Sequence, residues 1–279
     1  MDVREYLSAA AWLDDLSPLL LGAEAENNLL LGLAGRAVEE PEQFPDGPRL
    51  WAIANQGTPV GAALLTPRNL VLSRQPAAAL AALADSLAAS SEMVPGVVGP
   101  DDSPDQFAAR WAARTSVGRR ERMRQRIHAC AEVIWPRRAA GDFRAATEDD
   151  VQLLADWWVA FAREVDSGPA SDDPEATVRR IIGSGRLFVW TVDGEGVSCA
   201  GVTRPTASGI AVYFVYTPPQ QRGHGFATSC VAELTHRMLS TGRRFCCLYT
   251  DLANPISNAI YARLGYRRVC DSQWWEFAG

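Results

Sequence analysis

A glycine-containing segment late in the chain constrains the fold more than any other feature. It reads Arg222-Gly-His-Gly-Phe-Ala227 and separates the apolar run 210–216 from a stretch whose apolar positions recur at helical spacing. Because the run is apolar on both faces, it predicts a strand in the middle of a sheet. Glycines at such a junction let the backbone approach an anion, and free N–H groups of the loop and helix start bind phosphate oxygens. We therefore expect a pyrophosphate-binding loop here, with a plain glycine turn as the alternative.

A dinucleotide-binding turn is a second alternative for the same segment. Gly223-His-Gly225 has the G-x-G spacing of such turns, and Asp251 ends the next predicted strand. That turn normally follows the first strand of a parallel unit, whereas this loop follows a hairpin meander late in its domain. The position in the chain therefore favours the pyrophosphate loop.

The second half of the chain has the pattern of an α+β domain. A break at residues 135–142 separates it from the first half, and a mostly antiparallel, mixed sheet flanked by helices is expected. Helices are predicted at 148–165, from 173–174, at 227–241 and at 255–264, and strands at 143–147, 187–192, 197–203, 210–216, 245–250, 266–269 and 274–277.

The first half repeats part of this order, which suggests an internal duplication, although any pair of α+β domains can give a similar order. Strands are predicted at 50–57, 59–65, 69–72, 94–98 and 120–133, and helices at 76–89 and 104–114. We expect two domains, 1–138 and 142–279. Alternating arginines, Arg120, Arg122, Arg124 and Arg126, are expected on one face of the last strand. That face is expected to be solvated, with contact to an anionic substrate as the alternative.

Two motifs resemble the GNAT superfamily of N-acetyltransferases. Residues 215–227 resemble its acetyl-CoA loop, whose pattern Q/R-x-x-G-x-G/A is met by Arg222, Gly225 and Ala227. Residues 254–266 look like its later motif, in which an asparagine and a helix-borne tyrosine precede a Gly-aromatic pair. The resemblance covers residues 143–277 by motif, and the first half by architecture alone.

The resemblance implies tandem GNAT-like domains, with strands four and five splayed apart in the second and acetyl-CoA between them. The acetyl carbonyl would lie near the N–H groups of Val215 and Tyr216, Asn254 and Asn258 would line the pantetheine, and Tyr261 would hydrogen-bond the sulfur. The pyrophosphate would lie on the amides of Arg222, Gly223, His224, Gly225, Phe226 and Ala227. A tyrosine, with an ordinary pKa of about 10, stays protonated at neutral pH and suits protonation of a leaving thiolate. Packing of the last helix is the alternative role of Tyr261.

The general base is harder to assign, because residues 210–217 contain no acid where many relatives carry a glutamate. Asp251, Glu164 and Asp166 are the candidates. Asp251 has an alternative role as the cap of the helix that begins at Pro255. Water, or deprotonation of the amine in solvent, is a further alternative. His224 is expected to point to solvent.

The first half has no glycine loop at the corresponding junction. Residues 72–77 read Leu-Ser-Arg-Gln-Pro-Ala, and the proline lacks an N–H donor. We expect a degenerate, noncatalytic domain that shapes the acceptor site. Contact of its alternating arginines with the adenylate of CoA is a further alternative to a solvated face.

Composition excludes several classes of protein. All 27 basic residues are arginine, so lysine Schiff-base chemistry and the phosphate-loop lysine are excluded. A net charge of -6 argues against nucleic acid as a partner. With no signal-like start and no apolar stretch long enough for a bilayer, a cytoplasmic protein that does not bind membranes is expected.

The six cysteines and three histidines show no metal-ligand spacing, so the cysteines are interpreted as buried hydrophobes and no metal is expected. The leading hypothesis is an acetyl-CoA-dependent N-acetyltransferase, monomeric or homodimeric. It would acetylate a primary amine, a small molecule or a peptide N-terminus, by direct attack in a ternary complex. The alternatives are an acetyl-CoA-binding regulatory module and an interaction protein with a spent site.

Overall fold

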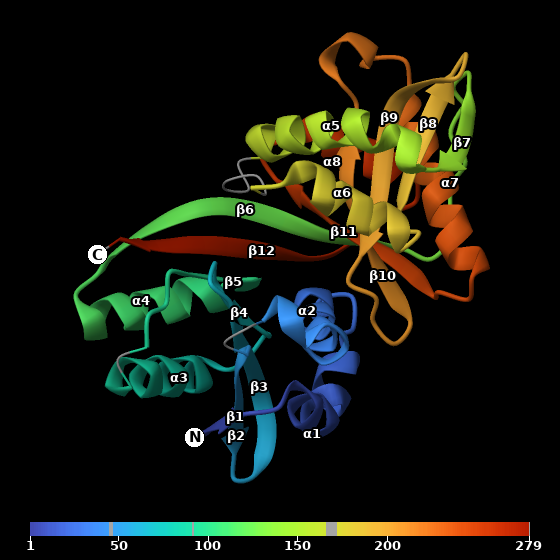
Figure 1. Ribbon diagram of the computed structural model, residues 1–279. Coiled ribbons are helices and arrows are strands. Elements are labelled where there is room, and N and C mark those ends of the chain that lie inside the picture. The colour runs from blue at the N-terminus through green and yellow to red at the C-terminus, as the bar shows by residue number, and fades with distance from the viewer. Residues whose placement is uncertain (45–46, 91, 166–171, 279) are drawn as a thin grey trace.

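A single twelve-stranded sheet runs through the whole molecule. The computed structural model describes residues 1–44, 47–90, 92–165 and 172–278 (Figure 1). The strand order is β1-β2-β3-β4-β5-β12-β6-β11-β10-β9-β8-β7. The mixed, mostly antiparallel sheet confirms the expected fold class, and its parallel pairs are β4 with β5 and β10 with β11.

The N-terminal half contributes six strands and four α-helices. The strands are β1 (Asp2–Tyr6), β2 (Arg49–Asn55), β3 (Thr58–Leu65), β4 (Leu70–Leu72), β5 (Gly96–Pro100) and β6 (Gly118–Cys130). The helices are α1 (Ala9–Leu21), α2 (Asn28–Glu39), α3 (Ala77–Ala89) and α4 (Ser103–Thr115), with a short 3-10 turn η1 (Pro41–Gln43).

The C-terminal half repeats this order. Its strands are β7 (Asp142–Ala145), β8 (Leu187–Val192), β9 (Glu195–Thr203), β10 (Gly209–Tyr216), β11 (Phe245–Asp251) and β12 (Arg267–Ala278). Its helices are α5 (Val151–Glu164), α6 (Pro174–Gly183), α7 (Phe226–Ser240) and α8 (Pro255–Arg263), with 3-10 turns η2 (Glu148–Asp150) and η3 (Pro219–Gln221).

The two halves exchange their last strands. β6, from the first half, pairs with β11 of the second, and β12, the end of the chain, inserts between β5 and β6. The long β6–β12 pair crosses the middle of the molecule in Figure 1. Each half therefore completes the other's sheet, and the proposed domains 1–138 and 142–279 are joined by more than the segment between them.

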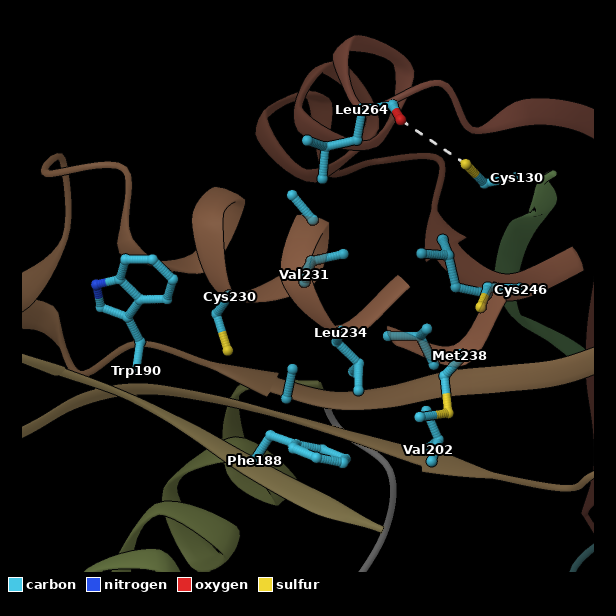
Figure 2. Close-up of a cluster of buried hydrophobic side chains, with 14 of the residues drawn as sticks. Cys130, Phe188, Trp190, Val202, Cys230, Val231, Leu234, Met238, Cys246 and Leu264 are labelled. Carbon is cyan, nitrogen blue, oxygen red and sulfur yellow. Dashed lines mark hydrogen bonds between the residues drawn. The ribbon is translucent and has the colours of Figure 1, made fainter. Parts of the chain in front are cut away.

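Helices cover both faces of the sheet in each half. α7 and α8 pack on one face of the C-terminal half around a cluster that includes Phe188, Trp190 and Val231, shown in Figure 2. α5 and α6 cover the opposite face. The N-terminal half has α3 and α4 on one face and α1 and α2 on the other. All six cysteines are buried and free, as predicted.

Three features of the sequence-based assignment need correction. β12 is one strand rather than two, because pairing with β6 carries it through residues 270–273 and β5 pairs with it from Ser272 onward. The elements β1, α1 and α2 were not predicted. The β6–β12 register skips Arg122, and this bulge interrupts the expected alternation of the arginines.

The arginines of β6 are ion-paired rather than simply solvated. Arg120 and Arg122 share Glu276 of β12, Arg126 pairs with Asp271 of β12, and Arg124 pairs with Glu121. Three of these four arginines thus join the two exchanged strands. Within the described residues, no helix is both long and apolar enough to cross a bilayer.

Candidate active site

The site begins where β10 and β11 separate. Their parallel register ends at the pair Ala211 and Cys247, whereas β10 continues to Tyr216. A bulge in β10 shifts its register with β9 between Tyr213 and Tyr216, and Phe214 within it has a φ of +48°. A bulge bends its strand and strengthens the local twist. The expected splay of strands four and five is therefore confirmed.

Aromatic packing from α5 holds this bulge. The Phe214 ring is fully buried and meets Trp158 and Phe161 edge to face, with ring centroids 4.9 Å and 5.4 Å away. A left-handed conformation in a bulky residue is strained and persists only where its surroundings impose it. The aromatic positions of α5 therefore shape the opening, a role that their helical spacing did not reveal.

The end of β10 is fixed from β9. The Ser198 hydroxyl lies 3.0 Å from the backbone oxygen of Tyr216 and donates to it, and lies 2.8 Å from the Thr217 hydroxyl. Tyr216 is buried on the α5 side, and Val215 packs against the cluster beneath α7. Burial, and next the nearby Glu164 carboxylate, raise the pKa of Tyr216. The two predicted carbonyl-polarising residues thus sit at a rigid strand end beside the opening.

The glycine loop leads from this strand end to α7. Gly223 and Gly225 have φ values of +83° and +80°, which L side chains rarely adopt. A side chain added at Gly223 would meet nothing within 4 Å, and one at Gly225 only the Ala139 methyl at 3.9 Å. Gly225 is the N-cap of α7 and supplies no side-chain cap, so the first amides of the helix lack an acceptor of that kind. This exposed, uncapped helix start fits a phosphate group.

Two side chains of the loop, those of Arg222 and His224, contact other protein groups and do not line the proposed phosphate site. The Arg222 guanidinium donates to the Thr217 backbone oxygen at 2.9 Å and to both Glu164 oxygens at 2.7 and 2.8 Å. His224 is exposed, as expected, and stacks on Phe226 with ring centroids 5.3 Å apart. The loop therefore offers its backbone rather than its charged side chains.

The corner between β11 and α8 holds three predicted residues in one hydrogen-bond network. Asn254 caps α8 by accepting from the Ser257 amide at 3.1 Å. The Asn258 amide donates to the backbone oxygens of Asp251 and Asn254 at 2.9 and 2.7 Å. The Asp251 carboxylate accepts from the Ala253 amide at 2.8 Å. Both asparagine side chains thus hold the start of α8, and the helix cap is Asn254, not Asp251.

A histidine that the sequence left without a role extends this network. His128 Nε2 lies 3.2 Å from Thr250 Oγ1, and the Thr250 hydroxyl donates to Asn258 Oδ1 at 2.6 Å. Burial lowers the pKa of His128. His128 is on β6, so only the strand exchange brings it under α8. No local sequence pattern predicts the contact between His128 and Thr250.

Tyr261 is partly buried at the edge of the cluster that also contains Phe226 and borders Val215. Its ring packs edge to face on Tyr266, with centroids 5.7 Å apart. Burial raises the pKa of Tyr261 to about 12. The phenol therefore keeps its proton at neutral pH.

The candidate general bases differ in their exposure and in their ion pairs. Glu164 is about half exposed and ion-paired with Arg222. Asp251 is partly exposed at the end of β11, beside the opening. Asp166 lies outside the described residues. Within the described ranges, no group of histidine, cysteine, aspartate or glutamate side chains has the arrangement of a metal site.

Comparison with known proteins agrees with this geometry. Residues 194–275 match the model of the family described as FR47-like protein. No curated protein matches the sequence. An acetyltransferase from the GNAT family of Colwellia psychrerythraea is similar over 99% of both chains, with 14% identity and a TM-score of 0.58.

Two further solved structures are similar over nearly their whole length. A Drosophila protein covers 99% of this chain and 98% of its own, at 13% identity and a TM-score of 0.66. A tandem GNAT protein from the clavulanic acid biosynthesis pathway covers 100% and 99%, at 12% identity and a TM-score of 0.56. At such identities the likeness establishes the fold, and the fold is that of tandem GNAT proteins.

Proposed function

We propose that this chain, which has the tandem GNAT fold, is an acetyl-CoA-dependent N-acetyltransferase whose active site lies in the C-terminal half. One observation carries the proposal: the opening between β10 and β11 leads directly into an exposed, uncapped helix start with two left-handed glycines. An elongated ligand with a thioester at one end and a pyrophosphate farther along fits that combination of an anion site and a strand opening.

Acetyl-CoA, when bound, supplies an activated acetyl group. The amides from Arg222 to Ala227 are the residues that would hold its pyrophosphate, and the free edge of β10 at Val215 and Tyr216 would orient its carbonyl. Asn254 and Asn258 contribute indirectly, because their side chains fix the start of α8. Arg222 keeps its side chain on Glu164 and presents its backbone.

Tyr261 is the proposed acid. Its hydroxyl holds a proton at neutral pH and can donate it to a sulfur that leaves as thiolate. Asp251 is the proposed base, since it is partly exposed at the mouth of the opening and can accept a proton from an acceptor ammonium group. Glu164 is the weaker candidate, because a bidentate ion pair occupies both of its oxygens.

The proposed acceptor is a primary amine of a small molecule or a peptide N-terminus, attacked directly in a ternary complex. The second candidate function is an acetyl-CoA-binding regulatory module. It is favoured by one observation, that β10 has no acid and Glu164 is tied to Arg222.

A thiol-release assay separates the two functions. The protein is incubated with acetyl-CoA and a panel of amino acids, polyamines and short peptides, and free thiol and acetylated amine are quantified together. We expect equal amounts of both with at least one amine, and calorimetric titration should give one acetyl-CoA site per chain. Binding without thiol release for any amine would favour the regulatory module. The lack of any binding would contradict both functions.

A further inference from the structure

A small cavity between the two halves is lined by three arginines, two of which, Arg186 and Arg204, form no ion pair among the described residues. α2 of the N-terminal half lies beside β10 in Figure 1, and the cavity opens between α2 and the start of the β9–β10 loop. Its volume is about 20 Å³, and it is partly open to solvent. The lining residues are Gly32, Gly35, Arg36, Glu39, Glu40, Arg186, Arg204 and Pro205. The cavity is therefore built from both halves and is separate from the glycine loop.

Arg204 is placed here at a structural cost. Its backbone φ is +49°, a left-handed value that is strained in a residue with a long side chain. Its side chain packs so closely on α2 that any side chain at Gly32 would overlap it. The guanidinium carbon lies 5.7 Å from the centre of the Tyr249 ring. The contacts with Gly32 and with the Tyr249 ring thus hold the Arg204 side chain at this position despite the backbone strain.

Two of the three arginines that line the cavity form no ion pair among the described residues. Arg204 Nε is buried without a hydrogen-bond partner among the described residues. Within the same ranges, the structure shows no carboxylate in ion-pair distance of Arg186 or Arg204. Arg36 donates to the Thr203 hydroxyl at 3.2 Å. Burial lowers the pKa of Arg36, the Glu40 carboxylate opposes this, and Arg204 lowers it further.

Gly35 keeps the cavity open. It lies inside α2, where a glycine is unfavourable relative to alanine, and a side chain there would meet nothing within 4 Å. Unlike Gly32, it has no close neighbour that demands a glycine. The absence of a side chain at Gly35 leaves space between α2 and the arginines of the cavity.

From these observations we propose that the cavity binds an oxyanion, a carboxylate or phosphate group, held by Arg186 and Arg204 across the two halves. The planar guanidinium presents paired N–H donors that match both groups, and partly buried arginines without partners gain most from such a ligand. The negative groups that share the cavity are Glu39 and Glu40. Arg180, beside Arg36, adds positive charge.

Titration with inorganic phosphate tests the site. We expect saturable binding by the full chain that sodium chloride at equal ionic strength does not reproduce. Arg204→Gln and Arg186→Gln should each weaken it about ten- to a hundredfold, the usual effect of losing a hydrogen bond to a charged group. Arg137→Gln, which removes an exposed arginine elsewhere, is the matched control and should bind like the parent. Unchanged affinity in both cavity variants, or an equal effect of chloride, would overturn the proposal.

Two further variants separate this site from the others. Gly35→Leu fills the cavity with a good helix former, so phosphate binding should be lost while the melting temperature is kept or raised. A parent-like affinity in this variant would overturn the proposal even if the arginine variants failed to fold. Gly225→Val alters the proposed acetyl-CoA loop, so phosphate binding that disappears in it would place the anion there instead.

A turnover experiment, which rests on the proposed function, identifies the source of the oxyanion. If the anionic group belongs to the acceptor, phosphate should compete with the amine and raise its KM without changing kcat. If a separate anion occupies the cavity, succinate or phosphate should bind without competing with the amine. Either result supports the site, whereas absence of phosphate and succinate binding overturns it.

Discussion

The two halves of the molecule share a fold and differ at the junction that would hold a cofactor. In the C-terminal half, β10 extends five residues beyond its last pairing with β11 and enters a loop with two left-handed glycines. In the N-terminal half, β4 ends one residue after its last pairing with β5. The following residues, 73–76, form no glycine loop.

Side chains close the N-terminal junction. Arg74 pairs with Glu26 at 2.7 Å and also with Asp101, so it ties the start of α2 to the end of β5. Gln75 is buried against Gly61, where a side chain would overlap it. Side-chain contacts thus fill, in the N-terminal half, the place where the C-terminal half has an opening.

The last helix of each half repeats the contrast. Each ends at a left-handed residue, Gly265 after α8 and Ser116 after α4, with φ values of +96° and +60°. Counting back four residues gives Tyr261 in α8 and Ala112 in α4. The position of the proposed acid is therefore an alanine in the N-terminal half. The two halves thus share the element order and the helix ending, and they differ at the position of this tyrosine.

The largest expected effect comes from separating the halves. Without residues 1–138, β11 loses β6, and β12 loses both of its partners, β5 and β6. Each segment produced alone should therefore lack a cooperative unfolding transition, and mixing the two should restore one. Thermal unfolding followed by near-ultraviolet circular dichroism tests this. A native-like transition from segment 142–279 alone would show that the exchange is dispensable.

Gly225→Val should abolish acetyl-CoA binding, by more than about a hundredfold, because a branched side chain is strained at a φ of +80° and blocks approach to the backbone. Calorimetric titration measures the loss. Gly194→Val is the matched control, since Gly194 also has a left-handed φ, +86°, and open space but lies in the β8–β9 turn. Equal losses in the two variants would indicate a general folding defect, and unchanged binding in Gly225→Val would place the cofactor elsewhere.

Tyr261→Phe should lower kcat by about ten- to a thousandfold while acetyl-CoA affinity changes little, the usual effect of removing one positioned acid. The ring and its packing on Tyr266 are retained, so stability should be close to that of the parent. Steady-state kinetics with the amine found by thiol release gives the answer. Tyr266→Phe, which removes a hydroxyl bonded to Thr235 at 2.7 Å, is a control for loss of a buried phenol in the same cluster. A parent-like kcat in Tyr261→Phe would make Tyr261 a packing residue.

Arg74→Met should destabilise the N-terminal junction by about 2 kcal/mol and leave acetyl-CoA affinity unchanged. The substitution leaves the Glu26 carboxylate, only 10% exposed, without its cation. Urea unfolding measures the free energy. Arg110→Met breaks a more exposed pair, with Asp85, and should lower the stability much less than Arg74→Met does. Weaker acetyl-CoA binding in Arg74→Met would show that the N-terminal junction takes part in cofactor binding.

The sequence predicted the C-terminal half better than the N-terminal one, for physical reasons. Its loop and α8 follow local rules: glycines at left-handed positions, proline in the first turn of a helix and an asparagine cap. α1 and α2 contradict local rules, because Pro18 lies inside α1 and Gly32 and Gly35 lie inside α2. Packing in the folded chain, not local propensity, keeps these two helical.

Contacts between the halves could not be predicted from the pattern. The choice of strand partner depends on the whole fold, so nothing local places β12 beside β5 or His128 beneath α8. The bulge at Phe214 is equally hidden, since its residue type disfavours the observed φ. The residues predicted for the site, the glycine loop, Tyr261 and Asp251, all lie in the C-terminal half. Residues of the N-terminal half also contact the elements around them, and these contacts were not predicted.

Glu24 tests one such support and should give the smallest effect. Its carboxylate accepts from the Ser208 and Thr206 hydroxyls at 2.6 Å and from the Ser208 and Gly209 amides at 2.7 and 3.2 Å, so the N-terminal half clamps the β9–β10 loop. Burial opposes ionisation, but these hydrogen bonds outweigh it and lower the pKa of Glu24 below its ordinary value of 4.5.

A carboxyl with a lowered pKa in the folded state stabilises the protein fully above its unfolded pKa, and this contribution is lost as the pH falls through the folded value. Glu24→Gln should therefore cost about 1 kcal/mol at pH 7, and the difference from the parent should shrink below about pH 4.5. Urea unfolding at pH 7 and pH 3.5 measures both values, with Glu195→Gln, at the exposed first residue of β9, as control. A deficit equally large at both pH values would mean that the variant loses packing rather than the charged contact between the halves.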